Sequence, residues 1–235
     1  MRRDLIRFAA TALVMSAALA GCSDPDDPLH SGAPLATVGA GQLITAIQAG
    51  DAPAVRAALG AGASPDTVDG GGTPVLVLAT HADDIEVARL LIEAGADVNA
   101  KDRIQDSAYL YAAAEGRLAI LRLTLAHGAD LTSTNRFGGT GLIPAAHHGH
   151  VETVRELLKT SIDIDHINNL GWTALLEAVI LGDGGASHTE IVRLLVEAGA
   201  DMAVADRGGV TPLAHARERG YSAIVAILEA AGARN

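Results

Sequence analysis

The stretch IEVARLLIEAGADVNAKD, residues 85–102, decides the fold, because its closing phrase returns along the chain at a nearly fixed interval. The position of its glycine is filled in chain order by Gly62, Gly95, Gly128, Ser161, Gly199 and Gly232. The spacings are 33, 33, 33, 38 and 33 residues. Self-similarity at one such period predicts a stack of alike structural units.

A second phrase keeps the same period and predicts the first helix of each unit. It begins with a Thr or Ser that can cap a helix, at Thr73, Ser107, Thr140, Thr173 and Thr211. The apolar spacing in residues 85–95 and 190–199 predicts a second helix, closed by a glycine in the left-handed conformation. One helix pair is too small to bury its apolar faces, so stacking must complete the core.

These phrases resemble the ankyrin repeat over about residues 41–233, with specific matches in GADVNAKD from Gly95, in GHVETVRELL from Gly149 and in the two Thr-Pro phrases, TPVLVLA from Thr73 and TPLAHAR from Thr211. The resemblance implies an all-α solenoid of about six helix-turn-helix units with short β-hairpin or loop tips. We place units 1 to 6 at residues 41–69, 70–102, 103–135, 136–168, 169–206 and 207–235, with the first and last as caps. The histidine usual after TPL is replaced by Leu76, Leu110, Ile143, Leu176 and Ala214, which predicts apolar packing there.

Units 4 and 5 depart most from the pattern. Five extra residues, 183–187, fall between the two helices of unit 5, and Gly184 and Gly185 predict a longer, flexible loop at the rim. Unit 4 has Gly141 where proline is usual, Pro144 inside a short helix and Ser161 in place of the closing glycine. Because departures from local rules often cluster at functional sites, these units are the predicted functional region.

Composition and motifs exclude several classes of function. Apolar residues make up 49% of the chain and aromatic residues 3%, so the core is expected to consist of Ala, Leu, Val and Ile. A formal net charge of -11 argues against nucleic acid as a partner. No nucleophile elbow, phosphate-loop lysine or zincin pattern is present, and an open stack encloses no pocket, so we expect neither enzyme activity nor a cofactor.

The cluster of His147, His148 and His150 invites a metal-site interpretation. However, His150 matches a structural histidine of the repeat, and adjacent helical positions point about 100° apart, so one ion is not expected to reach all three rings. We therefore predict no metal site.

The N-terminal segment MRRDLIRFAATALVMSAALAGC has a basic start and an apolar run that is short for a membrane span. It resembles a bacterial lipoprotein signal, residues 1–21, which implies cleavage before Cys22 and lipidation of that residue. The alternative is an ordinary cleaved signal with an incidental cysteine. Residues 22–40 are acidic and rich in proline and predict a flexible tether. We expect a lipid-anchored periplasmic protein, and Ser23 after the lipidated cysteine favours the outer membrane.

The resemblance also implies that tips and first helices line a concave face that holds other proteins. The predicted tip residues are Arg103, Ile104, Arg136, Phe137, Asn169, Leu170, Trp172 and Arg207. The first helices add Tyr111, Glu115, His147, His148, Glu177 and Leu181, whose charged members we expect on a solvated face, while Tyr109 belongs by phase to the core. Arginine and aromatic residues on an acidic protein match the composition of binding hot spots. Alternatively, Phe137 and Trp172 pack sideways on adjacent tips and stiffen them.

The sequence therefore predicts a lipid-anchored scaffold that binds a protein partner through units 3 to 5 and holds or inhibits an envelope enzyme. One alternative is an accessory factor in oxidative-stress defence, linked to a catalase. Another is a metal or small-ligand carrier that uses His147, His148 and His215. We expect a monomer.

Overall fold

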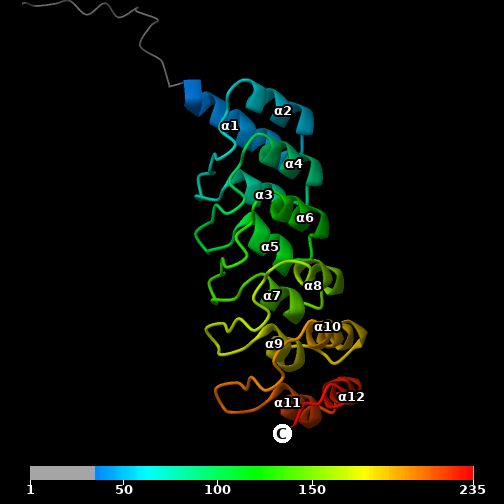
Figure 1. Cartoon of the computed structure of the whole chain (residues 1–235). Helices are drawn as coiled ribbons and strands as arrows, with labels where there is room; N and C mark the ends of the chain where they lie inside the picture. Colours follow the sequence, from blue (N-terminus) through cyan, green and yellow to red (C-terminus); the bar gives the residue numbers. More distant parts are fainter. Residues whose placement is uncertain (1–34, 235) are drawn as a thin grey trace, which may run out of the picture. The chain divides into compact units, whose positions relative to one another are not determined.

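The computed structural model describes residues 35–234, and these form helix pairs stacked one on the next (Figure 1). The pairs are α1 (Leu35–Gln48) with α2 (Ala52–Gly60), α3 (Val75–His81) with α4 (Ile85–Glu93), α5 (Ala108–Ala114) with α6 (Leu118–Ala126), α7 (Leu142–His147) with α8 (Val151–Leu157), α9 (Ala174–Ile180) with α10 (Ala186–Glu197), and α11 (Pro212–Glu218) with α12 (Ser222–Ala230). The predicted all-α solenoid of six helical units is confirmed.

The core runs continuously from unit to unit. Each odd-numbered helix packs on the next odd-numbered helix and each even-numbered helix on the next even-numbered one. Figure 1 shows the tip loops on one side of the odd-numbered helices and the even-numbered helices on the other. The buried side chains are mainly Ala, Leu, Val and Ile, together with Tyr109, as its phase predicted. The residues that replace the usual histidine are also buried, except Ala214, which is half-buried.

Three of the five predicted side-chain caps form, and Thr73 forms none, because α3 begins after Pro74 without a side-chain cap. The hydroxyl oxygens of Ser107, Thr173 and Thr211 accept hydrogen bonds from the backbone N–H three residues on. The hydroxyl of Thr140 in unit 4 does not: it is buried and has no hydrogen-bond partner among the described residues. The short helix α7 follows Gly141 instead, without a side-chain cap.

The irregular residues of unit 4 have structural explanations. Pro144 is the third residue of α7, where a backbone N–H has no acceptor within the helix, so the proline removes no helical hydrogen bond. A Cβ atom at Gly141 would lie 2.9 Å from the hydroxyl oxygen of Tyr109, so only glycine fits beside that ring. Helix α8 ends at Leu157, and the Thr160 hydroxyl donates to the Leu157 carbonyl at 2.6 Å, a different ending from the left-handed glycine of the other units.

The five-residue insertion is partly helical. Ala186 and Ser187 belong to α10, so only residues 183–185 lengthen the connection. The Asp183 carboxylate accepts a hydrogen bond from the Gly185 N–H at 2.8 Å, and the Tyr221 hydroxyl of unit 6 donates to the Gly182 carbonyl at 2.9 Å. The segment is thus hydrogen-bonded to its surroundings, in contrast to the plain flexible loop that the sequence predicted.

The N-terminal predictions are mostly outside the described residues. Helix α1 begins at Leu35, so residues 35–40 of the predicted tether are helical. The signal peptide, Cys22 and the remainder of the tether lie outside the described range. From residue 35 to 234 no helix combines the length and the apolar character that crossing a membrane requires.

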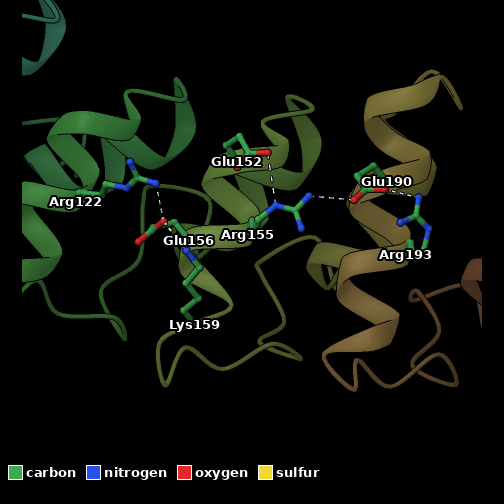
Figure 2. A network of polar contacts seen from close by, with 7 residues as sticks. All are labelled: Arg122, Glu152, Arg155, Glu156, Lys159, Glu190 and Arg193. Carbon is green, nitrogen blue, oxygen red and sulfur yellow. Dashed lines mark hydrogen bonds and ion pairs between the residues drawn. The ribbon is translucent and has the colours of Figure 1, made fainter.

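Ion pairs join the even-numbered helices of units 3 to 5 (Figure 2). Arg122 of α6 contacts Glu156 of α8 at 3.0 Å, and Arg155 of α8 contacts Glu190 of α10 at 3.1 Å. Lys159, which follows α8, contacts Glu156, and Arg193 contacts Glu190 within α10. Because exposed ion pairs contribute about 0–1 kcal/mol each, apolar packing between the helices remains the main source of stability.

Candidate binding groove

A groove of about 420 Å³ crosses units 3, 4 and 5, between the tip loops and helices α5, α7 and α9. Seven large apolar side chains are exposed among the described residues, and four of them line this groove. They are Ile104, Phe137, Leu170 and Leu181, with exposed fractions of 50%, 52%, 47% and 43%. Apolar surface is thus concentrated at one concave place on the stack, as is typical of a binding site.

Many of the predicted site residues meet in this groove. Those that line it are Ile104, Tyr111, Glu115, Arg136, Phe137, His147, His148, Leu170, Glu177 and Leu181. The other four predicted residues do not line it. Arg207 donates a hydrogen bond to the Asn169 carbonyl at 2.7 Å, and Arg103 lies against Gly72 of the preceding tip. Trp172 is half-buried.

The tip of unit 4 presents an aromatic ring whose neighbouring arginine is already engaged. The guanidinium carbon of Arg136 lies 4.8 Å from the centre of the Phe137 ring. The same guanidinium is 3.5 Å from the Asp106 carboxylate. Burial raises the pKa of Asp106, and nearby Asp102 raises it further, whereas Arg136 opposes both effects. Arg136 therefore offsets a charge within the chain, and Phe137 is the more available contact for a partner.

Glu177 is buried in the groove, which corrects the expectation that it lies on a solvated face. Its side chain is 8% exposed. The Asn168 side-chain amide donates to one carboxyl oxygen at 2.8 Å, and the His147 ring nitrogen Nδ1 lies 3.7 Å from the other. Burial raises the pKa of Glu177 to about 7, although the hydrogen bond from Asn168 lowers it. Glu115, by contrast, is exposed as expected.

His147, the last residue of α7, and His148, which follows it, contact the neighbouring units. The His148 ring nitrogen Nδ1 lies 2.7 Å from the Ala114 carbonyl of unit 3, and the His147 carbonyl lies 2.9 Å from Nε2 of His188 in unit 5. Burial lowers the pKa of His147, and the charges of His148 and His188 lower it further, which favours a neutral ring at neutral pH. Across residues 35–234, no three His, Cys, Asp or Glu side chains are grouped so as to hold a metal ion.

Sequence reasoning missed several groove residues, including Asp106, Asn135 and Asn168. A periodic signal for the two asparagines exists: an Asp or Asn recurs five residues before the capping Thr or Ser of units 3 to 6. This residue stands just before the predicted unit boundary, and we count it with the tip of the unit that follows. In units 4 and 5 the side-chain oxygen of this residue accepts two backbone N–H bonds of its tip. This position fixes the shape of the tip and also faces the groove.

Comparison with known families identifies the repeat. The family model for three copies of the ankyrin repeat matches residues 109–206, and the model for a single ankyrin repeat matches residues 71–103. An ankyrin repeat domain from Acinetobacter baumannii AYE is 55% identical, with a TM-score of 0.80, over 82% of this chain and 98% of that one. The chain belongs to the ankyrin-repeat family.

Other ankyrin-repeat proteins show the same likeness. The crystal structure of the ankyrin repeat protein EF0377 is 43% identical over 81% of this chain and 97% of that one, with a TM-score of 0.78. The ankyrin repeat domain of Bcl-3, a member of the IkappaB family, is 30% identical over 82% of this chain and 86% of that one, with a TM-score of 0.74. The ankyrin repeat protein YahD of Escherichia coli (strain K12) is 51% identical over 57 residues, which is 24% of this chain and 28% of YahD.

Ankyrin repeats generally mediate protein–protein interaction and are typically not enzymes.

Proposed function

We propose that this chain is a lipid-anchored scaffold of the bacterial periplasm that binds a protein partner in the groove of units 3 to 5, and so holds or inhibits an envelope enzyme. The gathering of Ile104, Phe137, Leu170 and Leu181 in one groove carries this proposal. Each such side chain contributes about 25 cal/mol of favourable binding free energy for every Å² of its apolar surface that a partner covers. Since stable interfaces bury about 800 Å² on each partner, the interface would include the adjoining tips as well as the groove.

The binding site is tested by cross-linking the tagged protein to its neighbours in intact cells and identifying them by mass spectrometry. Leu170 and Ile167 make a matched pair, because both are exposed apolar residues of one tip but only Leu170 lines the groove. We expect Phe137→Ala and Leu170→Ala each to lower recovery of the specific partner about fivefold or more, as for a hot-spot residue. Ile167→Ala should leave recovery unchanged, and equal recovery from all three variants would refute the site.

The anchor is a separate part of the proposal and rests on the sequence Leu19-Ala20-Gly21-Cys22. Replacing Cys22 by Ser removes the sulfur that would carry the lipid. We expect the variant to lose incorporation of a labelled fatty acid and to move from the membrane fraction to the soluble periplasmic fraction. If the variant and the wild type distribute alike, the chain is not a lipoprotein of this kind.

A further inference from the structure

Glu177 lies in the groove without a lysine or arginine of the described chain beside it. The groups that face it are the Asn168 amide, from the tip that leads into α9, His147, the last residue of α7, and the ring of His148. The lowered pKa of His147 keeps that ring neutral at neutral pH. The ring of His148, which follows α7, is already directed at the Ala114 carbonyl. Burial raises the pKa of Glu177 and outweighs the Asn168 hydrogen bond and the charge of His148, which both lower it. The carboxyl group is therefore removed from water without a lysine or arginine to compensate.

Unit 6 provides an internal reference for this arrangement. Asp206 and His215 occupy the same repeat positions as Asn168 and Glu177, five residues before and four residues after the capping threonine. There the His215 ring nitrogen Nε2 lies 2.8 Å from the Asp206 carboxylate, so a carboxylate and an imidazole satisfy each other within the chain. In unit 5 the acidic residue, Glu177, stands at the helix position, and the tip position opposite it holds the neutral amide of Asn168.

The surroundings of Glu177 suit a side chain with an apolar stem and a cationic end. Phe137, Leu170 and Leu181 line the same groove, and exposed Glu115 adds a second acidic group. Lysine and arginine side chains lay their methylene stems along apolar surface while the charged end remains polar. The net charge of -11 also favours approach of a basic segment.

We propose, building on the protein-binding role above, that the groove takes a partner segment in which one lysine or arginine stands between apolar residues. The cationic end lies on the Glu177 carboxylate, and the flanking side chains pack on Phe137, Leu170 and Leu181. A segment with a neutral or acidic residue at that point leaves the carboxylate buried and unpaired, which is unfavourable. The groove thus selects its partner by charge as well as by apolar contact.

A random peptide library displayed on phage, selected on the immobilised full chain, tests this proposal. We expect the selected peptides to share a lysine or arginine, with leucine, isoleucine or an aromatic residue close to it on both sides. A representative synthetic peptide is then compared with its analogue in which methionine replaces the basic residue. The dissociation constants are measured by fluorescence anisotropy at neutral pH.

Glu177→Gln keeps an oxygen that accepts the Asn168 hydrogen bond and removes only the charge. We expect both Glu177→Gln and the methionine analogue to weaken binding about tenfold or more, and their combination to weaken it little further, because each change removes the same pair. Glu197→Gln, at an exposed position outside the groove, makes the same change in net charge and should have no effect. The peptide substitution needs no protein variant, so the result does not depend on the folding of Glu177→Gln.

The experiments distinguish failure of the groove as the binding site from failure of the charge selection by Glu177. Loss of peptide binding to Leu170→Ala but not to Ile167→Ala would support the groove as the binding site. If the peptides then share no basic residue, or bind Glu177→Gln as well as the wild type, the charge selection is wrong and the groove remains the binding site. If no peptide is selected, or if Leu170→Ala leaves binding intact, then the groove is not the binding site and both levels fall.

Discussion

Units 5 and 6 place the same two repeat positions against each other but fill them with opposite chemistry. In unit 6 a carboxylate on the tip meets a histidine on α11, Asp206 with His215 at 2.8 Å. In unit 5 an amide on the tip meets a carboxyl group on α9, Asn168 with Glu177, also at 2.8 Å. Hydrogen bonds, chiefly from the Val210 N–H and then from His215, lower the pKa of Asp206, whereas burial raises that of Glu177.

The comparison separates the position that shapes the repeat from the one that varies. Asn168 and Asp206 each accept two backbone N–H bonds of their own tip, so either side chain preserves the turn. The position on the helix accepts no such bonds, and its residue type differs from repeat to repeat. In units 2 to 6 it is Val77, Tyr111, Pro144, Glu177 and His215. The chemistry of the groove can therefore change without disturbing the stack.

The largest effect is expected from Asn168→Asp, which places two carboxyl groups where an amide meets one. We expect the free energy of unfolding to fall by about 2 kcal/mol near pH 8, because a favourable hydrogen bond becomes repulsion between like charges. Near pH 5 the loss should be smaller, since the two groups can share a proton. Urea denaturation at both pH values measures this. The double variant Asn168→Asp/Glu177→His rebuilds the pair of unit 6 and should recover most of the loss; an equal loss at both pH values would contradict the explanation.

Glu177→Gln is expected to stabilise the fold, by a smaller amount. The folded state holds the Glu177 proton up to about pH 7, whereas the unfolded state releases it near 4.5, so the cost of the wild-type residue grows over that range and is constant above it. One pKa unit corresponds to about 1.4 kcal/mol, and we expect a gain of about 1–2 kcal/mol near pH 8 and none near pH 4.

The gain from Glu177→Gln is measured as the difference between variant and wild type in urea denaturation at each pH. His147, His148 and Asn168 face the same group and are present in both proteins, so the difference isolates the residue. A gain that does not change with pH would show that burial of the charge is not its cause.

Asp206→Asn should have a smaller effect, because the amide oxygen still accepts the bonds from Gly208 and Val210. The lowered pKa of Asp206 means that its charge stabilises the fold above its ordinary value of 3.8 and ceases to do so as the pH falls through its folded value. We expect a modest decrease in melting temperature at neutral pH that disappears in acid. A decrease that persists unchanged in acid would point to lost packing instead.

The smallest effect is expected from Arg207→Ala, which removes the hydrogen bond from the tip of unit 6 to the Asn169 carbonyl in the tip of unit 5. Since the arginine is exposed, the free energy of unfolding should fall by only about 0.5 kcal/mol. Hydrogen exchange should become faster at the Asn169 amide while the helices of unit 5 exchange as before. Uniform acceleration throughout units 5 and 6 would contradict this local role.

The sequence predicted the fold because the repeat is carried by many residues at once. The glycines of the period, the capping Ser107, Thr173 and Thr211 and the phase of Tyr109 all appear in the structure as predicted. Each depends on local rules of helix capping and amphipathic spacing, which one chain is enough to apply.

The groove was predicted less completely, because its chemistry depends on contacts between units. Helical phase placed Glu177 on the groove side, but its burial depends on the tip folding back so that Asn168 reaches it. Gly141 looked like a functional irregularity and is instead required by the ring of Tyr109 in the preceding unit. Trp172, predicted as a contact at the tip, is half-buried and does not line the groove. Such outcomes depend on which side chains meet across the stack.

The tips of units 4, 5 and 6 are joined in series, since the Asn169 N–H donates to the Phe137 carbonyl and Arg207 donates to the Asn169 carbonyl. Loops that must be immobilised on binding cost conformational entropy and weaken the complex. Here that ordering has already taken place during folding, so a ligand arriving at Phe137 meets a pre-organised rim. The affinity at this edge consequently depends on the contacts that form there, because ordering of the tip backbone costs little additional conformational entropy on binding.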